Sequence, residues 1–297
     1  MNRGDAEQGM RRSPLLPWLL VLPTALGVAA FTLYPMLATA YRSLFKQNQA
    51  IRVPRFTGLG NYKEVATDDT FHEVFRNTIL FIIGTVPASI ILALLFALFL
   101  NRKLKGIGIL RSAFFYPTVL PMVSAAAIWL FLYTPNFGLV NQGLRAVGLS
   151  APNWLGDTTF VLPALMVMAV WKQTGYFMLF YLAGLQNLPD EIFEAAELDG
   201  ASRLQQVRYI TLPLLQPTTL FVSTIAAVGS IQTVDQIYIM TQGGPSNASN
   251  LLLFYIYETA FRFRNLGVAN AATVILVLLL LIFTVANFTI SERRAQW

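Results

Sequence analysis

Polar side chains that could bind a small molecule lie inside two long apolar runs of this sequence. The stretch VWKQTGY places Lys172, Gln173 and Tyr176 in one run. Such groups bind a solute through hydrogen bonds and charge, and they are costly in lipid unless they face a bundle interior or a wet cavity. We therefore expect a polar pathway here. The second run, GSIQTVDQ, contributes hydroxyl, amide and carboxylate groups at Ser230, Gln232, Thr233, Asp235 and Gln236.

The two polar sets do not simply neutralise each other. Lys172 lies near the centre of its run, whereas Asp235 lies beyond the centre of the next one. At 1.5 Å of rise per residue, the axial offset is roughly 10 Å, too far for a direct ion pair between straight helices. Ser230 and Thr233 lie closer to the level of Lys172. We favour a solute contact from both runs, with Asp235 nearer the outer entrance; hydrogen bonding between helices is the alternative.

The sequence lacks the residues that most covalent and metal chemistry needs. It contains no cysteine, which excludes disulfides, thiolate metal sites and cysteine nucleophiles. His72 is the single histidine, and no G-x-x-x-x-G-K-[ST] phosphate loop occurs. We expect no catalytic residue, cofactor or metal site. The net charge of +6 is typical of basic loops at a membrane and does not indicate nucleic-acid binding.

Composition places these residues in a membrane protein. Apolar residues make up 55% of the 297 residues and charged ones 12%, and the apolar residues gather in long runs. About twenty such residues span the roughly 30 Å hydrocarbon core as a helix. We predict an all-α, polytopic bundle in one transmembrane domain, residues 15–290. Its six spans are predicted at about 15–41, 79–100, 113–133, 160–183, 216–240 and 269–290.

The first predicted span could instead be a cleaved signal peptide. Arg11 and Arg12 precede it, and the sequence at 38–40, Ala-Thr-Ala, resembles a cleavage site. The apolar stretch between them is too long for the core of a signal peptide. We favour a retained helix.

Loop charge predicts the orientation of the spans. The short loop NRKLKGIGILR at 101–111 holds four basic residues and no acidic one. Basic loops are retained in the cytoplasm, although the overall bias of this chain is modest. A cytoplasmic loop here puts the N-terminus (1–14), the segment 187–213 and the tail (291–297) in the cytoplasm too.

The polar segment 187–213 has the signals of two short helices. Pro189 suits a first helical turn, helix formers follow through Leu198, and Gly200 is placed to end the helix in a left-handed conformation. A second helical stretch at 203–210 leads to Pro213. The segment is either an ordinary solvated loop or a docking helix for a partner. An apolar ridge on the first helix, made by Ile192, Phe193 and Ala196, favours docking.

This segment also carries a family resemblance. EAAELDGASRLQQVRYITLPLLQP resembles the EAA loop of ABC-importer permeases, with Val207 where carbohydrate-type members usually carry an aromatic residue. The resemblance implies a cytoplasmic coupling helix that docks in a cleft of a nucleotide-hydrolysing subunit. The matching positions are Glu194, Ala195, Ala196, Asp199, Gly200, Ala201, Ile210, Leu212 and Pro213.

Other stretches resemble the carbohydrate-uptake permeases, of the maltose-permease F-type and the glycerol-phosphate permease A-type. These are FTGLGNYKEV at 56–65, FRNTILF at 75–81 and DQIYIMTQGGPSNASNLLLFYIYETAFRF at 235–263. The resemblance covers about residues 15 to 290 and implies a type I ABC importer fold. In the maltose-type permease, the positions that hold the sugar match Lys172, Gln173 and Tyr176 in one helix and Gly229, Ser230 and Thr233 in the next.

The resemblance further implies partners and a location. The partners would be a second six-span permease (G-type), two P-loop ATPase subunits that bind ATP and Mg²⁺, and an extracytoplasmic solute-binding protein. The chain would be a multi-pass protein of a bacterial inner membrane that imports a sugar by alternating access. A phosphorylated polyol such as glycerol phosphate stays open as the solute, because Lys172 suits an anion too. An ion-coupled secondary transporter is the alternative of a different class.

Overall fold

The computed structural model describes residues 16–51, 53–101 and 105–295, and side chains are described from 19 to 289 within those ranges. The expected N-terminus, 1–14, lies outside the described residues. So do residues 102–104 of the basic loop and residues 296–297 of the expected tail. The described chain is an all-α bundle with one small β-ribbon.

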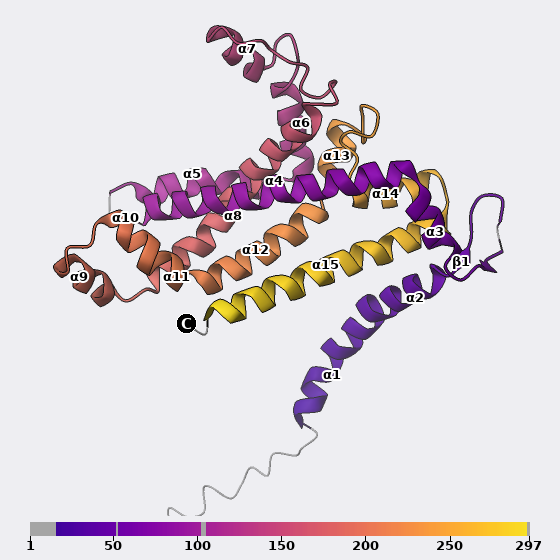
Figure 1. Ribbon diagram of the computed structural model, residues 1–297, viewed down its shortest axis with the longest axis horizontal. Helices are drawn as coiled ribbons and strands as arrows, with labels where there is room; N and C mark the ends of the chain where they lie inside the picture. Colours follow the sequence, from indigo (N-terminus) through magenta and orange to yellow (C-terminus); the bar gives the residue numbers. More distant parts are fainter. Residues whose placement is uncertain (1–15, 52, 102–104, 296–297) are drawn as a thin grey trace, which may run out of the picture.

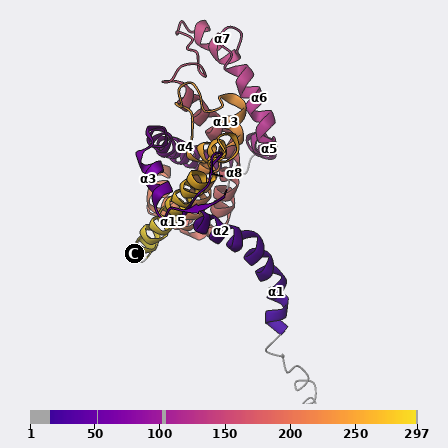
Figure 2. The same cartoon turned by 90° about the vertical axis from the view of Figure 1, so that its right-hand side faces the viewer.

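The N-terminal third forms a long rod, a ribbon and a long helix. The rod consists of two consecutive α-helices with a π-helical turn between them, and it contains Pro23 and Pro35. Prolines remove backbone hydrogen bonds from a helix, and a π-helical turn is one local adjustment that restores some of them. Figures 1 and 2 show the start of this rod standing away from the bundle. The elements are α1 (Leu16–Val28), the π-helix η1 (Ala29–Leu33), α2 (Tyr34–Arg42), β1 (Phe45–Lys46), β2 (Arg55–Phe56), α3 (Gly60–Thr67) and α4 (Asp69–Leu100).

The middle of the chain contains a sharply bent pair of helices and the polar segment. Two helices expected as one span at 113–133 meet at a bend of 97° around Leu120 and Pro121. The elements are α5 (Ile107–Val119), α6 (Met122–Leu132), α7 (Leu139–Ala146), α8 (Val161–Gln186), α9 (Asp190–Leu198), α10 (Arg203–Gln206), the π-helix η2 (Val207–Thr211) and α11 (Leu212–Leu214).

The C-terminal part contributes two long helices to the bundle, α12 and α15. The expected span 216–240 is interrupted at 232–234, and the last helix begins three residues before its expected span. The elements are α12 (Gln216–Ile231), α13 (Asp235–Met240), α14 (Leu252–Tyr257), the π-helix η3 (Glu258–Arg262) and α15 (Leu266–Ala295).

Small residues form the seam between the central helices α4, α8 and α12. Ala93 and Ala97 of α4 and Ala226 and Ala227 of α12 are fully buried in one cluster with aromatic and aliphatic side chains of α8. In lipid, helices associate through close packing rather than through the hydrophobic effect, so small residues at the seam bring backbones together. The long helices lie side by side in Figure 1, and α9 and α10 extend beyond one end of them.

Length and composition identify fewer spans than expected. Among the described residues, four helices are long and apolar enough to cross a membrane, or five if the bent pair α5–α6 counts as one span. They are Leu19–Arg42, Asp69–Leu100, Gln216–Met240 and Leu266–Thr289. Helix α8 has 26 residues but is not among them. Its polar centre, which contains Lys172 and Gln173, lowers its mean hydropathy.

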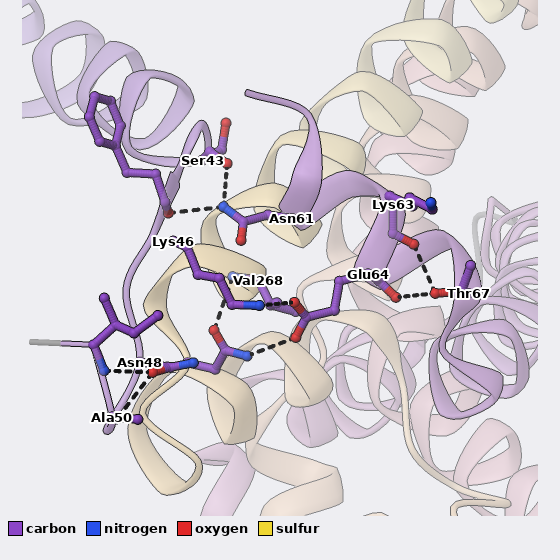
Figure 3. Close-up of polar contacts among 12 residues, drawn as sticks. Ser43, Lys46, Asn48, Ala50, Asn61, Lys63, Glu64, Thr67 and Val268 are labelled. Carbon is purple, nitrogen blue, oxygen red and sulfur yellow. Dashed lines mark hydrogen bonds and ion pairs between the residues drawn. The ribbon is translucent and has the colours of Figure 1, made fainter. Parts of the chain in front are cut away.

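A polar cluster ties the rod to the other end of the bundle (Figure 3). The Asn61 amide donates to the carbonyls of Ser43 (2.7 Å) and Phe45 (2.9 Å). Glu64 accepts from Lys46 at 3.2 Å and from the Asn265 amide at 3.3 Å. These bonds join the end of α2, the ribbon and α3 to the start of α15.

Candidate solute pathway and coupling surface

Local signals shape the first half of the polar segment. Helix α9 begins after the extended residue Pro189, and acidic side chains fill its first turn, where the positive end of the helix dipole favours them. Gly200 adopts φ +78°, as expected for a left-handed helix end. The N–H of Gly200 donates to the Glu197 carbonyl at 3.0 Å and that of Ala201 to the Ala196 carbonyl at 2.9 Å. The chain therefore turns sharply after α9.

A capping box starts the second half. The Ser202 hydroxyl accepts from the Gln205 N–H at 3.4 Å, and the Ser202 N–H donates to the Gln205 side chain at 2.7 Å. This S-x-x-Q pattern was visible in the sequence as a helix start, although the sequence analysis did not use it. Helix α10 then continues through the π-helix η2 to Pro213.

Large apolar side chains are exposed on this polar segment. Leu198 is 90% exposed, Leu204 77% and Tyr209 67%. Of the expected ridge, Ile192 is exposed, whereas Phe193 is half-buried. Such a patch at the end of a bundle is typical of a surface that a partner covers.

The residues of the EAA pattern lie along the whole segment. Their side chains divide between the open surface and the contact with the rest of the loop. Glu194, Ala195, Asp199, Gly200, Leu212 and Pro213 are exposed, and Ala196, Ala201 and Ile210 are half-buried.

Lys172 lies at the bend between α5 and α6. Its ammonium donates to three backbone carbonyls, those of Pro117 (3.2 Å), Thr118 (3.4 Å) and Leu120 (2.6 Å). An ammonium has three N–H donors, so these bonds use all of them. Neither of the salt bridges found within the described residues involves Lys172 or Asp235. The cation is therefore stabilised by carbonyl dipoles at the end of a helix.

Its neighbours on α8 have different surroundings. The Gln173 side-chain oxygen is buried and has no hydrogen-bond partner within the described part of the chain. Tyr176 is 37% exposed, and its ring packs edge-to-face on Phe180 at 5.0 Å between centroids. Tyr176 thus presents a partly open aromatic face, and Gln173 an unpaired acceptor.

The residues expected on the next helix are partly open and partly buried. A Cβ added at Gly229 would meet nothing within 4 Å. Ser230 is 1% exposed and its hydroxyl lies 3.1 Å from that of Thr85. Thr233 is also buried, and its hydroxyl donates to the Gly229 carbonyl at 3.2 Å. Gly229 therefore borders open space, while the two hydroxyls face helix backbone and side chains.

Gln236 and Asp235 likewise differ in exposure, one being buried and the other exposed. Gln236 is fully buried, and its amide donates to the Leu165 carbonyl of α8 at 2.7 Å. Asp235 is exposed in the first turn of α13. No hydrogen bond among the described residues joins the α8 residues 172, 173 and 176 to residues 229 and 230 of α12 or to residue 233 beyond its end. The same part of the chain contains no group of three or more acidic, histidine or cysteine residues that could hold a metal ion.

Gly175 also shapes this region and was not predicted as a site residue from the sequence. A Cβ at Gly175 would overlap the Phe114 carbonyl oxygen and lie 2.9 Å from its carbon. Helices α5 and α8 therefore touch backbone to backbone at this point. The signal in the sequence was a glycine inside an apolar run, which often marks such an approach.

Comparison with known proteins decides the family. Residues 71–296 match the family model described as "Binding-protein-dependent transport system inner membrane component". The chain belongs to this family of transport permeases. It is 34% identical, over 95% of this chain and 96% of the relative, to the trehalose/maltose transport system permease protein MalF of Thermococcus litoralis. It is 31% identical to the sn-glycerol-3-phosphate transport system permease protein UgpA of Agrobacterium fabrum, over 95% of this chain and 97% of the relative.

The fold of the permease has also been seen experimentally in another protein. It is similar to a chain in the crystal structure of a bacterial alginate ABC transporter in complex with alginate pentasaccharide-bound periplasmic protein. The TM-score is 0.82 at 21% identity, and the match covers 94% of this chain and 95% of that one. The permease is thus a multi-pass inner-membrane subunit of a binding-protein-dependent ABC importer, with ATP hydrolysis in a separate subunit.

Proposed function

We propose that the permease imports a neutral sugar or sugar-like solute, which an extracytoplasmic solute-binding protein delivers to it. The observation that carries this proposal is the full-length match to a permease named for trehalose and maltose, at 34% identity over 95% of this chain. Relatives of this identity share architecture and the general class of their cargo more reliably than the individual solute.

The solute would cross in a bundle of six spans with both termini in the cytoplasm. Helix α8, with 26 residues, is the sixth span beside the four apolar helices and the bent pair. Its polar centre is what a span that borders a wet pathway needs. The basic loop at 101–111 and the EAA segment at 187–213 would both face the cytoplasm.

The pathway would run between the faces of α8 and α12. Tyr176 offers a partly exposed ring, and the space beside Gly229 is open. Gln173 brings an acceptor that lacks a partner within the described residues. Lys172 would lie beside this pathway and the exposed Asp235 toward its outer entrance, while the buried Ser230, Thr233 and Gln236 would support its wall. Aromatic rings and amides are suitable groups for a hydroxylated solute.

Lys172 bears on the charge of the solute. Because three carbonyls occupy its ammonium, it is not free to pair with a phosphate. This favours a neutral solute over glycerol phosphate. Glycerol phosphate is the second candidate, because the chain is 31% identical to a glycerol-phosphate permease. An ion-coupled secondary transporter would need carboxylates within its spans, whereas Asp235 is exposed at the start of a short helix.

The exposed segment 187–213 would couple the permease to ATP. We propose that one of two P-loop ATPase subunits receives α9 with its exposed Leu198, and that a second, G-type permease completes the pathway. Closure of the ATPase pair would then move α9 and switch the cavity from one side to the other.

A mild-detergent pull-down of the tagged permease from native membranes tests this function. We expect to recover a P-loop ATPase, a second six-span permease and a solute-binding protein, identified by mass spectrometry. The recovered binding protein is then titrated with maltose, trehalose and glycerol phosphate by calorimetry. A permease that is recovered without partners and transports when reconstituted alone would contradict the proposal. A binding protein that binds only glycerol phosphate would replace the neutral solute by that anion.

A further inference from the structure

The backbone around the bend between α5 and α6 is short of hydrogen-bond donors. Helix α5 ends at Val119, Leu120 is extended (ψ 134°), and α6 begins after Pro121. In a continuous helix the Pro117 carbonyl would accept from the N–H of residue 121. A proline stands there and has no N–H. The break therefore leaves carbonyls without the N–H partners that a continuous helix would give them.

Lys172 supplies the missing donors from the neighbouring helix. Its ammonium reaches two carbonyls of the last turn of α5 and, with the shortest bond, 2.6 Å, the carbonyl of Leu120 in the linker. The bond to Pro117, 3.2 Å, satisfies the carbonyl that Pro121 deprives of a partner. The carbonyl end of a helix also favours a positive charge. The half-buried ammonium of Lys172 thus gains acceptors, and the unpaired carbonyls gain donors.

The contact is reciprocal and tightly packed. The Thr118 hydroxyl donates to the Lys172 carbonyl at 3.0 Å, so α5 and α8 bind each other in both directions. One turn further along α8, Gly175 allows the α5 backbone to lie directly against it. The start of the bend therefore has little freedom relative to α8.

Beyond the bend, α6 is seated on elements of the proposed pathway. The Tyr133 hydroxyl at its end donates to the Ala164 carbonyl of α8 at 2.9 Å. Ala125 and Ala126 are fully buried in a cluster that includes Ile237 of α13. Trp129 packs edge-to-face on Trp171, next to Lys172, at 5.6 Å between centroids. The angle at the bend thus decides where α6 meets α8 and α13.

We propose that Lys172 is a positioning residue that holds the bend between α5 and α6, and so sets the place of α6 beside the solute pathway. Its ammonium acts on the carbonyls of Pro117, Thr118 and Leu120 and not on the solute. The transport consequences rest on the proposed function, but the geometry of the bend does not.

Spin labels on the two arms of the bend test this directly. The chain has no cysteine, so Ile109→Cys and Phe131→Cys introduce unique sites, and these residues are 76% and 54% exposed. Backbone positions this far along the two arms lie about 21 Å apart at the observed bend and about 33 Å apart in a straight helix. The pair is measured by double electron–electron resonance in the purified transporter complex in lipid nanodiscs. A complex without the two introduced cysteines corrects for labels on other subunits.

We expect Lys172→Met to broaden the distribution toward longer distances by 5 Å or more, on the scale of that difference. Maximal uptake in proteoliposomes should fall about tenfold or more, with little change in the solute concentration for half-maximal uptake. Lys172→Arg, which keeps several N–H donors, should restore the wild-type distance. Lys63→Met, an exposed lysine of α3, is the matched control and should change neither.

A wild-type distance distribution in Lys172→Met would overturn the proposal. A change confined to the half-saturating solute concentration would do the same, since it indicates direct solute contact. If Lys172→Met does not assemble, Lys172→Gln is measured in its place, because its shorter side chain brings two N–H donors instead of three. A longer distance in Lys172→Gln supports the proposal, and a wild-type distance contradicts it.

Discussion

The backbone contact between α5 and α8 predicts an unusually severe glycine-to-alanine effect at Gly175. An added Cβ would overlap the Phe114 carbonyl oxygen and lie 2.9 Å from its carbon and 3.0 Å from the Phe115 Cα. Ordinary contact begins near 3.4 Å. Because all these atoms are backbone, no rotamer change relieves the overlap, and the two helices must separate by about 1 Å.

That separation has a cost that can be estimated. Overpacking a well-packed contact costs about 1–3 kcal/mol. A shift of this size also lengthens the Lys172 bond to Pro117, now 3.2 Å, beyond hydrogen-bonding range. Alanine gains about 1 kcal/mol of helix propensity in return. With about 1 kcal/mol for that hydrogen bond, we expect a net loss of about 2 kcal/mol, or a melting temperature lower by about 3 °C in a chain of this size.

The assay measures thermal unfolding of the purified complex by size-exclusion chromatography with fluorescence detection. Solute uptake is measured separately for the same variants. Two controls separate the backbone clash from the general effect of alanine. Gly108→Ala in α5 meets nothing within 4 Å, and Gly84→Ala in α4 meets only the flexible Met166 side chain. Both should melt within about 1 °C of wild type. A Gly175→Ala variant that melts with the controls and transports normally would refute the backbone contact.

Two further glycines test the pathway and the coupling surface. Gly229→Ala adds a Cβ that meets nothing within 4 Å, so it should leave the melting temperature unchanged, and the larger Gly229→Leu should reduce uptake severalfold; wild-type uptake in Gly229→Leu would remove Gly229 from the pathway. Gly200→Leu places a branched side chain at φ +78°, at a cost of about 1–2 kcal/mol, and should diminish co-purification of the ATPase and ATP-dependent uptake. Gly200→Asn, which tolerates this conformation better, is the control, and equal co-purification of the ATPase with both variants would contradict the coupling role.

Much of the fold could be predicted because lipid imposes strong rules on a sequence. Runs of about twenty apolar residues indicate helices regardless of what packs on them. The left-handed end of α9 was also predictable, because it depends on Gly200 and its immediate neighbours. The full length of α4, which begins at Asp69 rather than at the apolar run near 79, was not predicted. Its polar first turns project beyond the apolar stretch, where hydropathy gives no signal.

The role of the polar residues was harder to predict. The sequence predicted that Lys172 must avoid lipid, and it favoured a solute as its partner over hydrogen bonding between helices. The structure gives its ammonium three carbonyls of a helix that lies about fifty residues earlier in the chain. The buried amide of Gln236 likewise bonds the Leu165 carbonyl. Sequence reasoning could say that these groups need partners, but it could not choose between a solute and the backbone.

The sequence by itself determined the class of protein, most of the long helices and the turn after α9 in the segment 187–213, because apolar runs, prolines and glycine at a helix end act over a few residues. Only the tertiary structure decided which way α6 points and what Lys172 binds. Pro117 and Pro121 permit a break at many angles, and the angle of 97° follows from donors and close packing that α8 brings from elsewhere in the chain. A contact between distant segments depends on how all the helices pack at once, and no local pattern carries that information.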